Sequence, residues 1–92
     1  MKKLLKDSLL RELSRNFQSN PDIKSIVNRI TVSDIKSQGL SVDIRKNGIS
    51  FYFRMTLNGR TNRITIGSFP AISVANARRI CEAHRTRLML QS

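Results

Sequence analysis

The side chains of this 92-residue sequence best suited to covalent or acid–base chemistry are its single histidine, cysteine and tyrosine: His84, Cys81 and Tyr52. A nucleophilic cysteine needs a base beside it, and none is placed next to Cys81, so we expect this thiol to pack in the core. The six acidic residues form no paired or metal-like cluster, and no glycine-rich phosphate loop is present. We therefore expect no catalytic residue, no metal site and no cofactor, so that this chain alone is not an enzyme.

Recognition of a polyanion by basic side chains fits the composition better. The chain holds 17 lysines and arginines against 6 acidic residues, a formal net charge of +11. Residues 1–35 hold 7 basic and 4 acidic groups, whereas residues 36–92 hold 10 and 2, so the balances are +3 and +8. This charge favours a nucleic acid as the partner and indicates that the second part of the chain binds it.

Basic and hydrogen-bonding side chains recur at alternate positions between residues 41 and 65 and beside the turns expected there. Arginine, asparagine and threonine on strands can reach base edges in the major groove of DNA, while flanking basic residues hold phosphates. Arg54 and Arg63 are expected directly opposite each other, a like-charge pair that a negative ligand would relieve. The predicted DNA-binding residues are Arg45, Lys46, Asn47, Tyr52, Arg54, Thr56, Asn58, Arg60, Asn62, Arg63 and Thr65.

The same face also fits an ordinary solvated surface, because Thr, Tyr and Arg are tolerated on exposed strands. Under that interpretation Asp43 neutralises Arg54, its diagonal neighbour on the adjacent strand of the predicted sheet.

The segment that must position these residues alternates apolar and polar side chains from Leu40 onward, as half-buried strands do. The dipeptides Asn47-Gly48 and Asn58-Gly59 predict two tight hairpins, and therefore a three-stranded antiparallel meander over about residues 40–66. The turns put large apolar side chains opposite one another on one face. The expected pairs are Ile44 with Phe51, Val42 with Phe53, Leu40 with Met55, Phe53 with Ile64, and Phe51 with Ile66.

Two helical regions flank the predicted sheet. A helix over about 74–90, capped by Ser73, carries an apolar face that should cover the sheet, with Arg78, Arg79, Glu82, Arg85 and Arg87 on its outer surface. Residues 4–17 carry an apolar stripe, and the spacing of Ile23, Ile26, Val27 and Ile30 predicts a second short helix. The expected fold is α+β: a three-stranded antiparallel meander packed against a C-terminal helix, with an N-terminal helical extension over residues 1–30 and a binding domain over 31–92.

The remaining features point to a reducing compartment. One cysteine allows no disulfide framework, no segment is long enough to cross a bilayer, and no signal-peptide cleavage site follows the basic, leucine-rich N-terminus. We expect a cytoplasmic protein with no membrane partner.

A run near the start of the C-terminal helix resembles a signature of the phage-type tyrosine recombinases (integrases). It reads Ile64-Thr65-Ile66-Gly67-Ser68-Phe69-Pro70-Ala71-Ile72-Ser73, followed by Ala75, Ala77-Arg78 and Cys81. In that family's N-terminal arm-type DNA-binding domain, a strand ending in Leu-Gly-Ser/Thr-Tyr/Phe-Pro precedes a helix opening Ser-Leu-Ala-x-Ala-Arg. Phe51-Tyr52-Phe53-Arg54 is similar to its aromatic strand, and Asn58-Gly59-Arg60 to its hairpin.

The resemblance covers about residues 31–90 and implies sequence-specific binding of double-stranded DNA at arm-type sites near an attachment site. In the family the sheet enters the major groove, while separate domains bind the core site and cut DNA. Other recombinase protomers and accessory DNA-bending proteins are implied as partners, and a prophage or genomic island as the source. The resemblance also implies a bacterial host and association with its nucleoid. The chain departs from the pattern at Asn76, where an acidic residue is common, and in residues 1–30, which exceed the family's short lead-in.

His84-Arg85-Thr86-Arg87 spells the His-x-x-Arg of the family's catalytic domain, with Tyr52 as an imaginable nucleophile. The family's tyrosine follows that motif well downstream, whereas only five residues follow Arg87 here and none is tyrosine. His84 lies on the apolar seam of the helix, so we expect it to pack.

Two other functions remain open from the sequence. The chain could be a free-standing basic module that binds RNA or duplex DNA without arm-site specificity. It could also be an interaction module whose N-terminal helix docks on a protein or a membrane. Alternatively those first 30 residues cover the apolar sheet face.

Overall fold

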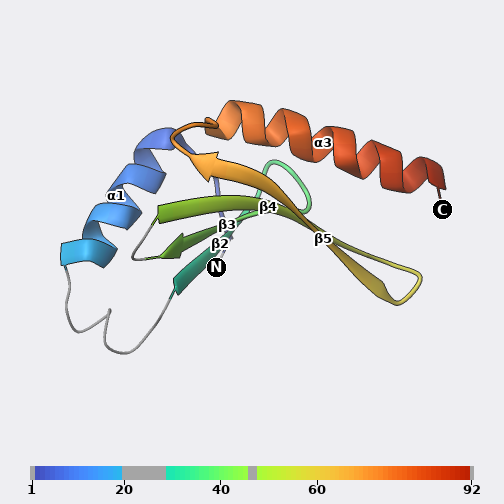
Figure 1. Ribbon diagram of the computed structural model, residues 1–92, viewed down its shortest axis with the longest axis horizontal. Coiled ribbons are helices and arrows are strands. Elements are labelled where there is room, and N and C mark those ends of the chain that lie inside the picture. Colours follow the sequence, from blue (N-terminus) through green and yellow to red (C-terminus); the bar gives the residue numbers. More distant parts are fainter. Residues whose placement is uncertain (1, 20–28, 46–47, 92) are drawn as a thin grey trace.

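The computed structural model describes residues 2–19, 29–45 and 48–91, in which two helices lie on one face of a five-stranded sheet (Figure 1). The strand order is β1-β2-β3-β4-β5; β1 runs parallel to β2, and the other neighbours are antiparallel. The α+β class is confirmed, but the three-stranded meander is wrong because β1 and β2 extend the sheet. The elements are β1 (Lys2–Lys3), α1 (Asp7–Ser19), β2 (Arg29–Asp34), β3 (Leu40–Arg45), β4 (Gly48–Leu57), β5 (Arg60–Phe69) and α3 (Val74–Gln91).

Strand β2 replaces the end of the second helix that the sequence predicts. Ile30 lies opposite Ile44 of β3, and Val32 lies opposite Val42 in the core. Arg29, Thr31 and Ser33 alternate with them and so lie on the other face of the sheet. The rest of that predicted helix, up to residue 28, falls outside the described residues.

The first hairpin differs in register from the expected one. Arg45 lies opposite Gly48, so the pairs are Ile44 with Ile49, Val42 with Phe51 and Leu40 with Phe53, two positions away from the expected partners. Strand β4 already begins at Gly48, whereas the expected turn included this residue; residues 46 and 47 lie outside the described residues. Because the shift is even, every apolar side chain stays on its predicted face.

The second hairpin turns at Asn58 and Gly59, whose φ angles of 52° and 79° are those that an Asn-Gly turn favours. The expected pairs of Phe53 with Ile64 and of Arg54 with Arg63 are confirmed. Beyond Tyr52 a bulge intervenes, so Phe51 lies opposite Gly67 and not Ile66. Strand β5 then continues to Phe69.

Both helices cover the same, apolar face of the sheet. Leu10 and Phe17 of α1, and Leu5 just before it, are buried in one core with Val74, Ala77 and Cys81 of α3. The further members of this core include Val32, Leu40, Val42, Ile44, Ile49, Phe51 and Phe53. The apolar stripe of the N-terminal helix is therefore used inside the fold, as a cover for the sheet, and is not free to dock on a protein or a membrane.

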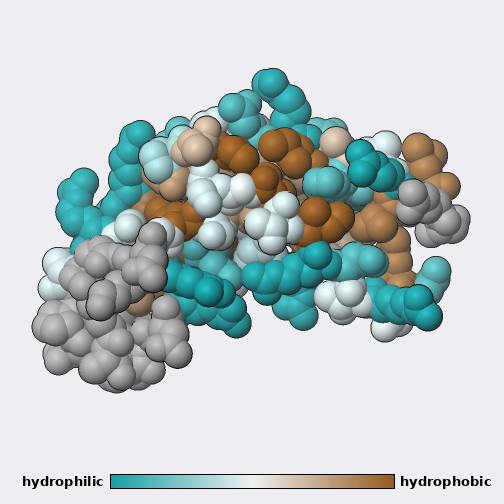
Figure 2. Space-filling model, viewed as in Figure 1, coloured by the Kyte–Doolittle hydropathy of each residue, from teal (hydrophilic) through white to brown (hydrophobic). Residues whose placement is uncertain are grey.

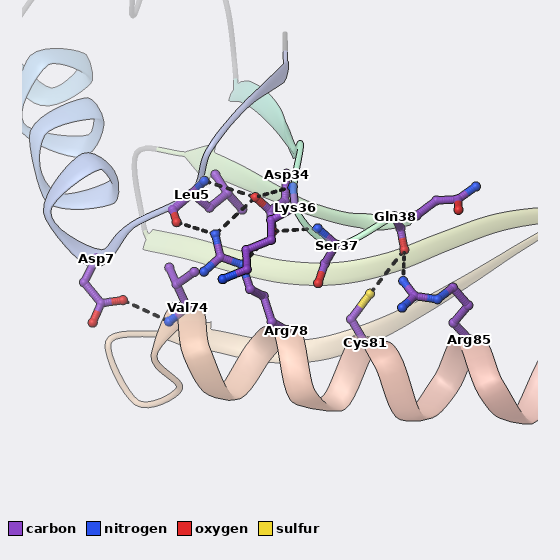
Figure 3. Close-up of polar contacts among 10 residues, drawn as sticks. All are labelled: Leu5, Asp7, Asp34, Lys36, Ser37, Gln38, Val74, Arg78, Cys81 and Arg85. Carbon is purple, nitrogen blue, oxygen red and sulfur yellow. Dashed lines mark hydrogen bonds and ion pairs between the residues drawn. The ribbon is translucent and has the colours of Figure 1, made fainter.

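The start of α3 is held by two side-chain caps. Ser73 accepts a hydrogen bond at Oγ from the Asn76 N–H at 3.2 Å, which confirms the predicted N-cap. Asp7, the first residue of α1, accepts one at Oδ1 from the Val74 N–H at 2.9 Å (Figure 3). A carboxylate also suits the positive end of a helix dipole, so Asp7 ties the beginnings of the two helices together.

Asp34, at the end of β2, forms a second link between the N-terminal segment and α3 (Figure 3). Its fully buried carboxylate accepts hydrogen bonds from the backbone N–H groups of Leu5, Lys36 and Ser37. Arg78 donates to both carboxylate oxygens, at 2.8 and 3.2 Å, and to the Leu5 carbonyl at 2.6 Å. The expectation that Arg78 lies on the outer surface of its helix is therefore wrong. Burial raises the pKa of Asp34, but these hydrogen bonds outweigh it and the pKa lies below its ordinary value.

Neither helix of the described segments is long and apolar enough to span a bilayer.

Candidate nucleic-acid interface

The sheet face opposite the helices is polar, and we call it the open face. In the view shared by Figures 1 and 2, α3 lies along the top, and hydrophilic side chains line the lower margin below the strands. Strand register brings onto this face four arginines and one acidic residue, so its balance is positive. Its residues are Lys2, Arg29, Thr31, Ser33, Ser41, Asp43, Arg45, Ser50, Tyr52, Arg54, Thr56, Thr61, Arg63, Thr65 and Ser68.

Asp43 lies at the centre of the open face and is only 2% exposed. Its Oδ2 lies 3.2 Å from Arg63, 3.6 Å from Arg29 and 3.6 Å from Arg45, while its Oδ1 accepts a hydrogen bond from Thr31 at 2.9 Å. The three arginine side chains are each about half exposed. We call Asp43 with these three arginines the Asp43 cluster; it joins strands β2, β3 and β5.

Arg63 reaches Asp43 by crossing over the ring of Tyr52. Its guanidinium carbon lies 3.9 Å from the ring centroid, a cation–π contact that holds the guanidinium over the ring. Tyr52 is consequently only 5% exposed, although the sequence places it among the DNA-binding residues of the polar face. Tyr52 supports Arg63 and does not offer a face on which a base could stack.

Arg54 lies directly opposite Arg63 but differs from it in its surroundings. The side chain is exposed and makes no ion pair or hydrogen bond within the described part of the chain, whereas Arg63 is held by Asp43. Asp43 thus neutralises Arg63 and not Arg54, the partner that the solvated-face interpretation gives it. Beside Arg54 lies a hollow of about 260 Å³ lined also by Lys2, Ser33 and Ser41. The guanidinium of Arg54 is therefore available to bind an anionic group of a ligand.

The structure divides the remaining predicted contacts. Thr56 and Thr65 are exposed on the open face, and Thr56 shares a 3.0 Å hydrogen bond with Thr61 across the strands. Asn58 is exposed at the hairpin turn, but Arg60 and Asn62 pair with Leu57 and Met55 and so share the opposite side of that hairpin. Lys46 and Asn47 lie outside the described residues.

Arg29 is a component of the open face that the sequence does not reveal. It lies opposite Arg45 at the start of β2 and is half exposed beside Asp43. The sequence does contain a pattern that would have predicted strand β2: polar Arg29, Thr31 and Ser33 alternate with apolar Ile30 and Val32. This pattern competes with the helical spacing of the preceding isoleucines.

Of the side chains suited to covalent chemistry, Cys81 lies in the core and His84 is partly buried. Cys81 is fully buried, and burial raises the pKa of its thiol to about 11, so the thiol stays protonated in neutral solution. His84 packs as expected, its ring stacked on Phe53 with centroids 6.1 Å apart. Its Nδ1 is buried without a hydrogen-bond partner among the described residues. In those same ranges, no three side chains come together that could hold a metal ion.

Residues 5–90 match a family model described as an arm DNA-binding domain. The matched region includes α1, which lies outside the stretch of about residues 31–90 that carries the sequence resemblance. No curated protein matches the chain.

Proposed function

Since this chain belongs to the arm DNA-binding domain family, which is typical of phage integrases, we propose that its open face binds double-stranded DNA at arm-type sites of a site-specific integrase. DNA is the partner that membership of this family indicates, and the family's domain is itself non-catalytic. The site specificity and the mode of binding are the proposal.

The observation that carries the proposal is the arrangement of arginines on the open face. Three guanidinium groups surround a single buried carboxylate and a fourth, that of Arg54, lies opposite Arg63, so the surface that meets solvent is cationic and rich in N–H donors. Guanidinium groups pair with phosphates and with the O6 and N7 atoms of guanine, in both cases through two parallel hydrogen bonds. A cationic sheet face of this kind suits a duplex better than a single strand, because its only aromatic ring lies beneath Arg63.

We propose that the sheet enters the major groove. The groove admits a narrow β structure, and the β4–β5 hairpin is the longest pair of strands on this face, with ten residues in each. The proposed base and phosphate contacts on the open face are Arg45, Arg54, Thr56, Arg63 and Thr65. From the sequence we add Lys46, Asn47, Asn58, Arg60 and Asn62. Arg60 and Asn62 would make their contacts from the other side of the β4–β5 hairpin. Tyr52 acts through Arg63.

We further propose that this domain acts within a longer tyrosine recombinase, in a bacterial host, whose separate domains bind the core site and cut DNA. Other protomers and accessory DNA-bending proteins would then meet it on the same DNA.

Selection of duplexes from a randomised pool should enrich one DNA sequence. The enriched duplex and a scrambled duplex of the same composition are then titrated with labelled protein at two salt concentrations. Phosphate contacts weaken for both duplexes as salt rises, but contacts to base edges do not, so the preference should persist at the higher concentration. Equal loss of binding to every duplex, with no enriched sequence, would leave a general basic module and refute arm-site recognition.

A further inference from the structure

We infer that Asp43 is a positioning residue for DNA recognition, and that Arg29, Arg45 and Arg63 act with it as one preformed unit that reads DNA. This inference rests on the proposed function and adds Arg29 to the binding surface. It assigns a role to the one acidic group on a face that meets a polyanion.

A carboxylate at this place is unexpected on electrostatic grounds alone. A carboxylate facing phosphates repels them, and the open face has no other acidic residue among those that register brings to it. Asp43 avoids that repulsion because it is 2% exposed and lies beneath the three guanidinium groups. DNA on this face would meet the arginines and not the carboxylate.

The carboxylate makes a close group of arginines possible. Three guanidinium groups within 4 Å of one oxygen repel one another, and without the shared anion the long side chains would spread apart into solvent. Holding them together in advance also reduces the side-chain entropy that each would lose on binding. Asp43 therefore lowers the positive charge of the open face by one unit, but it holds three arginine side chains in a fixed arrangement.

Each arginine keeps donors free for DNA. The contact to Asp43 is made through one terminal nitrogen in every case, Nη1 of Arg29 and Nη2 of Arg45 and Arg63. A guanidinium has five N–H donors in a fixed plane, so the nitrogens away from Asp43 can bond to a base edge or a phosphate. For one of the three, Arg63, a cation–π contact with the ring of Tyr52 also holds the guanidinium in place.

The test is the substitution Asp43→Asn, compared with Glu82→Gln on the exposed surface of α3. Each change raises the net charge by one, so simple attraction predicts slightly tighter binding for both variants. A positioning role predicts that Asp43→Asn lowers the preference for the enriched duplex over its scrambled control by roughly tenfold, about the discrimination that one side-chain contact to a base provides. Glu82→Gln should leave that preference unchanged.

Protection of the Cys81 thiol from alkylation, and the melting temperature, establish whether Asp43→Asn is folded. If it is not, Arg29→Gln and Arg79→Gln decide the matter, since both arginines are exposed and both changes remove one charge. The inference requires the preference to fall for Arg29→Gln and not for Arg79→Gln.

An undiminished preference in folded Asp43→Asn overturns the inference, as do equal effects of the two arginine changes. The absence of any preferred duplex for the unaltered protein would instead refute the proposed function, so the two failures are distinct.

Discussion

Replacing Asp34 by alanine is expected to lower the free energy of unfolding by about 3 to 5 kcal/mol, as removal of one partner of a buried ion pair does. The change leaves Arg78 without its carboxylate partner and three backbone N–H groups without their acceptor. These groups join the segment before α1, the loop after β2 and α3, so the loss should reach all three. Denaturant titration followed by circular dichroism measures it.

The matched control is Glu12→Ala on the exposed surface of α1, which should change the free energy of unfolding by less than about 0.5 kcal/mol. A loss below about 1 kcal/mol for Asp34→Ala would contradict the role given to this carboxylate.

Acid should reduce the difference between the unaltered protein and Asp34→Ala. Because the folded pKa of Asp34 lies below its ordinary value of 3.8, the folded state binds this proton less tightly than the unfolded state. The stabilisation is therefore complete above that ordinary value and is lost as the pH falls through the folded pKa. A difference that stayed constant down to the lowest pH at which the protein is folded would contradict the pKa shift.

Arg54→Ala and Arg63→Ala should each weaken binding to the enriched duplex by about 1 to 3 kcal/mol if each contacts a guanine. The Arg54 side chain is exposed and lies outside the core, so Arg54→Ala should change the melting temperature little. Arg63→Ala also uncovers Tyr52 and removes one cation from Asp43, so the two changes should not be additive. Fluorescence titration of both single variants and the double variant measures the coupling.

Arg79→Ala, on the exposed surface of α3, is the control for the loss of one charge. If it weakens binding as much as Arg54→Ala does, net charge alone accounts for the affinity and the open face has no special role.

The sequence predicted the polar face of strands β3 to β5 because its period of two is strict and its apolar partner face is long. An error of two positions in the first hairpin did not matter, since an even shift keeps every side chain on its face. The sequence could not fix the register of this hairpin. The dipeptide Asn47-Gly48 favours a turn, but it does not decide where in the turn the two residues lie. The bulge near Tyr52 could not be predicted from the sequence either, since it depends on how strands β4 and β5 pack in the fold.

The edge of the sheet was missed for a different reason. Strand β2 is six residues long, and its isoleucine at position 30 continues a helical spacing from residue 23, so the two periods compete. Strand β1 is two lysines without any apolar pattern. Without β2 the sequence could not place Arg29 beside Asp43, and the Asp43 cluster was therefore invisible until the strands were assembled.

The burial of Tyr52 and Arg78 likewise needed the three-dimensional structure. Alternation assigns Tyr52 to the polar face correctly, but it cannot show that Arg63 folds across the ring. Helical periodicity puts Arg78 next to the apolar seam of α3, and only the position of Asp34, 44 residues away along the chain, draws it toward the sheet. Long polar side chains reach partners that their own element does not predict.

The most direct test of DNA binding by the open face is the NMR signal of each arginine Nε–H during titration with the enriched duplex. These signals report on individual guanidinium groups and can be assigned by substitution. We expect the signals of Arg45, Arg54 and Arg63 to shift, and those of Arg79 and Arg87 on α3 to stay in place. Shifts confined to the α3 arginines, with the open-face signals unchanged, would contradict the account.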